Sequence, residues 1–208
     1  MKIERVQKMV LASDNQGKLA EFGRLLSPLG FEVQSQGFYQ VAPCDEPFET
    51  FVENALHKAR HAAAATGLPA LADDSGLCVA ALNGAPGVYS ARYAGNSGGA
   101  HLTKDQRNCA KLLADLNGAS NRQAYFYCVL VFVRHAHDPQ PIVVDGFWQG
   151  QVAEQLTGAG GFGYDACFFV PEHGLTAAQL SDEQKNLLSH RGQAARALIA
   201  RLSAQKTG

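Results

Sequence analysis

The chain has few cysteines and no paired cysteine motif. Its 208 residues include five cysteines, an odd number, and none of them stands in a CxxC pair. Three of the five lie inside apolar segments, which is typical of buried thiols. We therefore expect reduced, buried thiols rather than disulfides. The cysteines are Cys44, Cys78, Cys109, Cys128 and Cys167.

The sequence also lacks a long apolar segment and an excess of charge of either sign. The longest apolar stretch, residues 128–133, is far too short to cross a bilayer, and residues 1–5 hold no apolar signal core. A formal net charge of −1 and a pI near 6.6 give no general attraction to nucleic acid or to membrane surfaces. We expect a cytoplasmic protein without nucleic-acid or membrane partners, in which a local cluster of cations meets any anionic ligand.

No repeat and no low-complexity segment interrupts the chain. Hydrophobic residues make up 46% and charged residues 18%, an ordinary globular composition that excludes a disordered chain. The length suffices for one good core, so we expect a single domain over residues 1–208, with two lobes, rather than two small domains. Short turns join the strands expected at residues 125–133, 142–144 and 151–155, which leaves no room for helical crossovers. The sheet is therefore predicted to be mixed.

Two adjacent carboxylates, Asp73 and Asp74, follow an apolar strand expected at residues 70–72. The next two residues interrupt the apolar pattern before a second apolar segment at residues 77–82. Carboxylates at a strand end are costly to desolvate without cationic partners, so we expect a metal ion or basic side chains nearby. A polar turn with both carboxylates in water fits the same residues.

A loop of small polar residues follows the strand expected at residues 9–12 and precedes a segment with apolar residues at helical spacing. Such a loop presents free backbone N–H groups and the positive end of the helix dipole, which suits a phosphate group. A plain capping loop is the alternative, since the GxxxxGK[ST] sequence of a Walker A loop is absent. The loop comprises Ser13, Asp14, Asn15, Gln16, Gly17 and Lys18.

The segment at residues 157–165 carries four glycines in six positions, which allows close approach of a ligand to the backbone. Phe162 and Tyr164 offer flat faces for stacking, although a hairpin loop with both aromatics in the core is the alternative. Further along the chain lies a basic cluster, which alone would be typical of a solvated helix end. Its members are Lys185, His190 and Arg191.

A helix over residues 51–67 is indicated by a capping box at Thr50 and a narrow apolar stripe. His57 and His61 lie four apart on this helix, a spacing that can hold a metal. No HExxH sequence accompanies them, so we expect solvated helix surface instead. Glu46 precedes the helix and is a third candidate acid beside the two aspartates.

Together these groups suit a nucleoside triphosphate bound with Mg²⁺, because cations and amides meet phosphates, carboxylates meet the metal and an aromatic meets the base. Six segments, in order over about residues 9–200, also resemble the motifs of the Ham1/RdgB family, the inosine and xanthosine triphosphate pyrophosphatases. The segments are SDNQGK (13–18), TFVENA (50–55), ADDSGL (72–77), GAPGVYSAR (84–92), GFGYD (161–165) and SHRG (189–192).

The resemblance implies an α/β protein with an elongated mixed β-sheet flanked by helices, two lobes and a central active-site cleft, assembled as a homodimer. Family members hydrolyse non-canonical purine nucleoside triphosphates such as ITP, dITP and XTP to the monophosphate and pyrophosphate, with Mg²⁺ as the cofactor. A house-cleaning pyrophosphatase for other modified nucleotides and a non-catalytic nucleotide-binding module are the alternatives.

The resemblance also assigns roles to residues. Asp74 is the expected catalytic base and binds the metal together with Glu46. Residues 13–18 and Lys58 are expected to hold phosphates, and Ser75 to touch the substrate. The residues expected around the base and sugar are Phe162, Gly163, Tyr164, Asp165, Lys185, His190 and Arg191.

The chain departs from the family pattern in two places. The first loop of the family usually reads Thr-Gly-Asn, whereas this chain has Asp14 at the middle position, which sets an acid beside a triphosphate. The orientation of that loop is therefore left open. The Glu-Thr-Gly usual in the family after Glu46 is replaced by Pro47-Phe48-Glu49.

Overall fold

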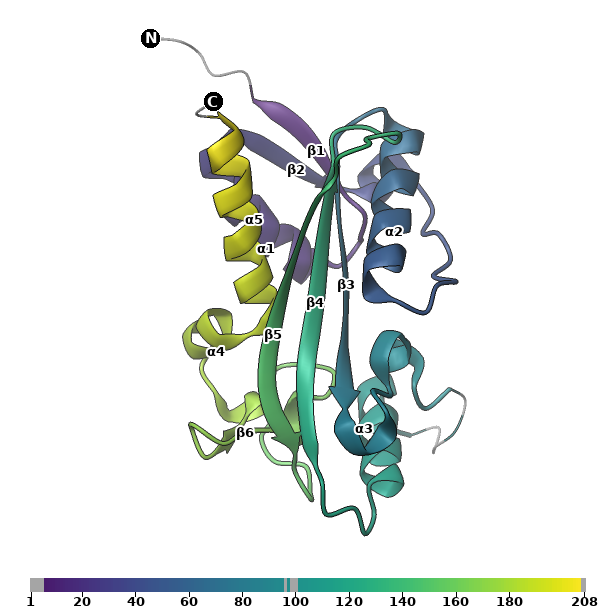
Figure 1. Cartoon of the computed structure of the whole chain (residues 1–208), viewed down its shortest axis with the longest axis vertical. Helices are drawn as coiled ribbons and strands as arrows, with labels where there is room; N and C mark the ends of the chain where they lie inside the picture. The colour runs from purple at the N-terminus through teal and green to yellow at the C-terminus, as the bar shows by residue number, and fades with distance from the viewer. Residues whose placement is uncertain (1–5, 96, 98–100, 207–208) are drawn as a thin grey trace. The chain divides into compact units, whose positions relative to one another are not determined.

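The computed structural model describes residues 6–95, 97 and 101–206, without the side chains of residues 205 and 206 (Figure 1). None of the helices formed by these residues is long and apolar enough to cross a membrane. The strands are β1 (Gln7–Leu11), β2 (Phe31–Ser35), β3 (Ala70–Val79), β4 (Gln123–Val133), β5 (Ile142–Val152), β6 (Phe168–Val170) and β7 (Leu175–Thr176). The α-helices are α1 (Gln16–Leu26), α2 (Phe51–Thr66), α3 (Lys104–Asp115), α4 (Asp182–Leu188) and α5 (His190–Lys206).

The strands of the described residues form one mixed sheet in the order β2-β1-β3-β4-β5-β6-β7. β1 is parallel to β2 and β3, whereas β6 is antiparallel to both β5 and β7. Only four residues separate β6 from β7, which leaves no room for a helical crossover, whereas a longer loop at residues 153–167 joins β5 to β6. The predicted α/β fold with a mixed sheet is therefore confirmed.

Contacts between residues divide the chain into two compact units, and the boundary falls within β3, between Asp74 and Ser75. Unit 1 comprises Met1–Asp74, Val129–Asp145 and Gln193–Gly208. Unit 2 comprises Ser75–Cys128 and Gly146–Gly192. The expected single domain with two lobes and a central cleft stays a prediction.

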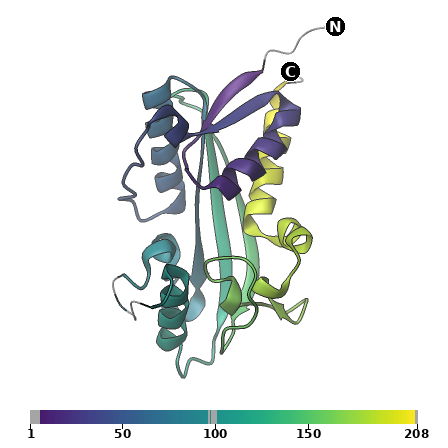
Figure 2. The same ribbon diagram turned by 180° about the vertical axis from the view of Figure 1, so that it is seen from behind.

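Unit 1 is built on the parallel strands β1 and β2 and the first half of β3. Val10 and Leu11 of β1 pair with Ala70 and Leu71 of β3, and all four side chains are fully buried. Helices α1 and α2 lie on opposite faces of these strands (Figures 1 and 2). The two faces of the strands are therefore covered by different helices.

The helices of unit 1 begin and end at residues suited to those positions. The side chain of Asn15 accepts the N–H of Lys18 and caps α1, and Thr50 accepts the N–H of Glu53 and caps α2. α2 ends at Gly67, whose φ of 68° is the left-handed conformation that favours glycine. The helix predicted at residues 51–67 is confirmed.

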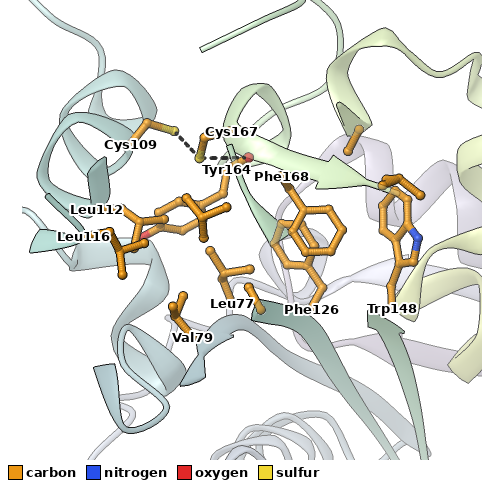
Figure 3. Close-up of a cluster of buried hydrophobic side chains, with 14 of the residues drawn as sticks. Leu77, Val79, Cys109, Leu112, Leu116, Phe126, Trp148, Tyr164, Cys167 and Phe168 are labelled. Atoms are coloured by element: carbon orange, nitrogen blue, oxygen red, sulfur yellow. Dashed lines mark hydrogen bonds between the residues drawn. The ribbon is translucent and has the colours of Figure 1, made fainter. Parts of the chain in front are cut away.

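Unit 2 has a separate core, to which β3, β4, β5, β6 and α3 contribute side chains (Figure 3). The ring centroids of Phe126 and Phe168 are 4.6 Å apart, and those of Trp148 and Phe168 are 5.2 Å apart. Leu112 of α3 and Leu116, the residue that follows the helix, belong to this cluster and are fully buried. Because α3 packs on the same cluster as the strands, its first turn is held at a fixed place in unit 2.

All five cysteines are free thiols, and four of them are buried, so the predicted reduced state is confirmed. Cys44 is half-buried. The sulfur atoms of Cys109 and Cys167 are 3.6 Å apart in the core of unit 2 (Figure 3).

Two of the strand predictions are wrong, and both errors come from polar or glycine residues read as breaks. β3 does not end at residue 72 but continues through both aspartates to Val79. β5 is a single strand: the segment predicted at residues 142–144 is its start, and of the segment predicted at residues 151–155 only residues 151 and 152 belong to its end. A Cβ on Gly150 would lie only 2.5 Å from the carbonyl oxygen of Phe169, so this glycine marks close approach to β6 and not a turn.

A buried carboxylate organises the turn between β4 and β5. The side chain of Asp138 is 1% exposed and accepts the backbone N–H and the Nε–H of Arg134, at 2.9 and 2.8 Å, and the backbone N–H of Gln140 at 2.9 Å. The hydrogen bonds from Arg134 lower the pKa of Asp138 far below its ordinary value, although burial opposes this shift. The ionised carboxylate is therefore part of the folded state.

We expect Asp138→Ala to lower the free energy of unfolding at pH 7 by about 1–3 kcal/mol, because several donors lose their acceptor. The folded pKa lies below the unfolded value of about 3.9, so this contribution is present above about pH 4 and is lost as the pH falls through the folded pKa. Urea unfolding should show the difference from wild type shrinking below pH 4. Lys111→Gln, which removes an exposed ion pair with Asp115, is the control and should change stability by less than about 1 kcal/mol. A difference that grows on acidification would contradict this account.

Candidate active site

Asp73 and Asp74 are consecutive residues of β3 and therefore point to opposite faces of the strand. Both are buried, with 4% and 7% of their surface exposed. The carboxylate of Asp73 binds Lys18 of α1, and that of Asp74 binds Lys58 of α2. The expected basic side chains are thus present, one on each face, and the alternative of an exposed polar turn is wrong.

Lys18 binds Asp73 through both carboxylate oxygens. Its Nζ lies 2.8 Å from Oδ1 and 2.8 Å from Oδ2. A carboxylate buried to this extent requires a cation or several donors, and Lys18 supplies the cation from the first turn of α1. The contact between Lys18 and a phosphate stays a prediction.

Lys58 lies between two carboxylates on the other face. Its Nζ is 2.7 Å from Oε1 of Glu46 and 3.0 Å from Oδ1 of Asp74. Burial lowers the pKa of Lys58, but the negative charges of Asp74, Asp73 and Glu46 outweigh burial and raise it above its ordinary value. The ammonium group stays charged, and it holds Glu46, from the loop before α2, close to β3.

The loop that carries Glu46 is fixed by a buried amide of α2. Asn54 is fully buried; its Oδ1 accepts the N–H of Phe48 at 3.1 Å, and its Nδ2 donates to the carbonyl oxygen of Phe48 at 3.0 Å. These paired bonds anchor the backbone two residues after Glu46. The segment at residues 50–55 predicted a helix start, but nothing in the sequence pattern predicted this role for Asn54.

One oxygen of Asp74 is buried without a donor. Its Oδ2 has no hydrogen-bond partner in the described part of the chain. Burial raises the pKa of Asp74 to about 6, although Lys58 opposes this shift. A buried oxygen of this kind is costly, and a bound cation would relieve the cost. With Glu46 alongside, two carboxylates offer the hard oxygen ligands that suit Mg²⁺.

The loop before α1 folds onto its own side chains. The Oγ of Ser13 accepts the N–H of Asn15 at 3.2 Å, and Oδ1 of Asn15 accepts the N–H of Lys18 at 3.0 Å. Gln16 and Gly17 begin the helix. The capping loop considered as an alternative is thus present, and it uses the same helix end that would bind a phosphate.

The carboxylate of Asp14 is bonded to the segment after β2. It accepts the N–H of Gly37 at 2.7 Å and an Nε2–H of Gln36 at 3.3 Å. The orientation of the loop, which the sequence left open, is fixed by this contact within unit 1. The predicted contact between Asp14 and a substrate is not tested.

In unit 2, two carboxylates bind consecutive backbone amides of the Gly-rich loop. Oδ2 of Asp165 accepts the N–H of Phe162 at 2.8 Å, and Oδ2 of Asp105 accepts the N–H of Gly163 at 2.7 Å. Lys185 binds the same oxygen of Asp165. These charge-assisted hydrogen bonds hold the loop. Sequence reasoning missed Asp105, because a position in the first turn of a helix does not reveal which amide lies opposite.

The two aromatic residues of this loop have different surroundings. Tyr164 is buried, and its hydroxyl donates to the carbonyl oxygen of Ser90 at 2.8 Å. Phe162 is 61% exposed, with Nζ of Lys185 4.8 Å and the guanidinium carbon of Arg191 5.5 Å from its ring centroid. The predicted stacking face is available on Phe162, while Tyr164 follows the alternative of an aromatic in the core.

The basic cluster adjoins the Gly-rich loop in unit 2 and is not a solvated helix end. His190 stacks on Phe126, with 4.8 Å between ring centroids and 10° between ring planes. The Nε of Arg191 is buried and has no hydrogen-bond partner among the described residues. The predicted residues that these contacts bring together are Phe162, Gly163, Asp165, Lys185 and Arg191.

The remaining candidates lie outside these two clusters of contacts. Ser75 is half-buried on β3. The ring of His57 packs against Phe48 with 5.5 Å between centroids, and Nε2 of His61 lies 2.9 Å from the carbonyl oxygen of Ala42. The two histidines have separate partners, and neither belongs to a group of three potential metal ligands in the described part of the chain.

Residues 9–201 match the Ham1 family. The chain belongs to this family. It is 56% identical over 202 residues to a dITP/XTP pyrophosphatase of Nitrosomonas europaea, which covers 97% of both proteins. It is 53% identical over 200 residues to a dITP/XTP pyrophosphatase of Neisseria meningitidis serogroup B, which covers 96% of this chain and 98% of that relative.

Solved structures of Ham1 proteins have the same fold as this Ham1 chain. A HAM1 protein from Coxiella burnetii matches with a TM-score of 0.89 and 47% identity, over 95% of this chain and 99% of the other. The Ham1 protein of Staphylococcus aureus matches with a TM-score of 0.86 and 40% identity, over 96% and 100% of the two chains. The family membership predicted from the six sequence motifs is confirmed.

We expect the loop of this Ham1 chain to tolerate alanine at Gly163 better than at Gly161. Both glycines have a left-handed φ, +61° at Gly163 and +74° at Gly161, so either substitution costs about 1–2 kcal/mol in backbone strain. A Cβ at Gly161 would also lie 2.2 Å from Oδ2 of Asp165 and 2.8 Å from Nζ of Lys185, whereas a Cβ at Gly163 meets nothing within 4 Å. Gly161→Ala should therefore cost a further ~1–3 kcal/mol in guanidinium unfolding. Equal losses for both variants would show that Asp165 does not hold the loop.

Proposed function

We propose that this Ham1 protein hydrolyses non-canonical purine nucleoside triphosphates, such as ITP, dITP and XTP, to the nucleoside monophosphate and pyrophosphate. Relatives at 56% identity over nearly the whole chain are named dITP/XTP pyrophosphatases. The structural observation that carries the proposal is the acidic pair of Glu46 and Asp74 on Lys58, in which one buried oxygen lacks a donor. Such a pair suits a polyphosphate together with its metal ion.

Unit 1 carries the groups that suit the phosphates. The helix start at residues 13–18 attracts anions, and Lys18 and Lys58 add full positive charges. Glu46 and Asp74 would hold Mg²⁺, with further ligands from phosphate and water, since the described residues contain no group of three protein ligands. When bound, the ion supplies charge compensation for the phosphoryl group and for the leaving pyrophosphate.

Asp74 is the group suited to activate water. In the proposed reaction water attacks the α-phosphorus, and the bond to the pyrophosphate oxygen breaks. Lys58 orients the carboxylate through Oδ1, at 3.0 Å, and leaves Oδ2 without a donor. That oxygen can accept the proton that the attacking water loses when Glu46 and the phosphates hold the ion, but not while Oδ2 is itself a metal ligand. Its position on a buried strand fixes the carboxylate more rigidly than a loop would.

Unit 2 carries the groups that suit the base. The exposed ring of Phe162 offers a stacking face, and Nε of Arg191 is a donor without a partner in the described residues. Hypoxanthine presents a 6-oxo acceptor and an N1–H donor, whereas adenine presents the reverse. A site that donates to O6 and accepts from N1–H would leave ATP with two mismatched buried groups, which can discriminate by a factor of about 10⁴.

The same proposal includes a homodimer in the cytoplasm, as the family resemblance implies. Sedimentation equilibrium of the purified chain tests the dimer, and a monomer at micromolar concentration would contradict it. Rates with ITP, XTP, dTTP and UTP separate this activity from a house-cleaning enzyme for other modified nucleotides. Faster turnover of a pyrimidine than of ITP would favour that second enzyme class.

We expect Asp74→Asn to lower turnover of ITP by at least ~10²-fold while the variant folds normally, because it removes the proposed general base. Pyrophosphate release is measured with Mg²⁺ and again after EDTA, which should abolish the wild-type activity until Mg²⁺ is restored. Asp115→Asn changes an exposed carboxylate of α3 and serves as the control. Near-normal turnover in Asp74→Asn would remove Asp74 from the mechanism.

We expect Arg191→Ala to lower kcat/KM for ITP far more than for ATP. Loss of one charged hydrogen bond to O6 corresponds to about 10- to 100-fold, so the gap between the two substrates should narrow by that factor. Arg201→Ala, an exposed arginine on the same helix, is the matched control and should leave selectivity unchanged. An unchanged ITP/ATP ratio in Arg191→Ala would show that this guanidinium does not read O6.

A further inference from the structure

Asp14 ties the loop before α1 to another segment of unit 1. Its Oδ1 accepts the N–H of Gly37 at 2.7 Å, and its Oδ2 lies 3.3 Å from Nε2 of Gln36, a residue that is 5% exposed. Gln36 and Gly37 begin the short 3-10 helix Gln36–Tyr39. On the other side, the carbonyl oxygen of Asp14 accepts an Nε2–H of Gln16, 3.4 Å away, in the first turn of α1. Asp14 thus connects two segments that are 22 residues apart in sequence.

Gly37 is needed for the closeness of this contact and not for its backbone conformation. A Cβ on Gly37 would lie 2.4 Å from Oδ1 and 3.1 Å from Cγ of Asp14. Gly37 is not among the glycines with positive φ, so alanine fits its backbone. Any side chain at position 37 would therefore displace Asp14, which makes the two positions a matched pair.

We propose that Asp14 is a positioning residue of the phosphate-binding loop. Its bonds to Gln36 and Gly37 hold residues 13–18 in the orientation in which the start of α1 meets the triphosphate. The inference rests on the proposed function, because it takes this loop as the phosphate site. Direct contact with the triphosphate would be unfavourable for Asp14, since a carboxylate and a phosphate repel each other. A positioning role explains why an acid can stand beside an anionic substrate.

The hydrogen-bond donors around Asp14 make this arrangement favourable. A backbone N–H and a side-chain amide both donate to its carboxylate, and hydrogen bonds to an ionised acceptor are stronger than neutral ones. The donors come from a segment outside the loop, so the negative charge is used to fix the loop. Because Asp14 and Gly37 are exposed, loss of the contact should alter the loop more than the stability of the core.

A double-mutant cycle on positions 14 and 37 tests the proposal. Asp14→Ala and Gly37→Ala should each raise KM for ITP by about tenfold, the scale of one charge-assisted hydrogen bond, with kcat and the ITP/ATP ratio unchanged. The double variant should be no worse than Asp14→Ala, because the new methyl group occupies the space that the carboxylate leaves. Asp14→Asn keeps an acceptor for the N–H of Gly37, and a turn of the Gln36 amide satisfies its NH₂, so it should restore KM to near the wild-type value.

The chain offers matched controls for both substitutions. Glu32→Ala removes another exposed carboxylate of unit 1 that is bonded to a glutamine, Gln34, at 3.2 Å. Gly23→Ala adds a methyl group on α1 that meets nothing within 4 Å. Neither should change KM.

Three results would overturn the positioning role. The first is an additive effect of the two substitutions on KM in the double variant, and the second is a lower unfolding midpoint of the single variants with KM unchanged. The third is a lower KM in Asp14→Ala, which would mean that the carboxylate acts on the phosphates by repulsion. Calorimetric binding of inorganic tripolyphosphate to the same variants separates this proposal from the proposed function. If the wild type binds tripolyphosphate but releases no pyrophosphate from ITP, the proposed function fails. The double-mutant cycle, measured on the affinity for tripolyphosphate, then still decides the role of Asp14.

Discussion

Burial of two adjacent carboxylates on one strand is the constraint on which unit 1 depends. Asp73 and Asp74 occupy opposite faces of β3, and an unpaired buried charge costs about 3–5 kcal/mol, so each face must supply its own cation. Lys18 and Lys58 meet this need from different helices. The two ion pairs of this strand therefore fix the positions of two loops. One is the loop before α1, at residues 13–18, and the other is the loop before α2, which carries Glu46.

Capping and stop residues in the sequence predicted those elements whose ends depend on residues within one helical turn. The cap at Thr50 and the stop at Gly67 define α2 through side-chain and backbone preferences within one turn, and these were predicted correctly. The continuity of β3 could not be predicted in the same way. The partner that makes Asp73 acceptable in a strand is Lys18, 55 residues away, and no pattern within a few residues reports such a partner.

The candidate site shows the same limit. Family motifs marked the Gly-rich loop and the basic cluster, and the structure joins them through Phe162 and Lys185. The motifs did not reveal that Asp105 and Asp165 act as acceptors for backbone amides, because sequence spacing carries no information about which N–H faces which side chain. Asn54 was hidden for the same reason, since its partner is the backbone of a loop. Several polar residues of the site thus hold the loops rather than carry out chemistry.

The acidic doublet has a further consequence for the pairing of β3 with its neighbours. Both faces of this strand are buried, so its apolar pattern alone specifies the alignment weakly. If β3 slid by one residue in one direction, Asp73 would lie opposite Lys58 and Ala72 opposite Lys18. In the other direction, Asp74 would lie opposite Lys18 and Ser75 opposite Lys58. A chain misaligned during folding would therefore meet a half-buried ammonium group without a counter-ion. The two ion pairs therefore favour the correct alignment of the strand that carries the proposed catalytic base.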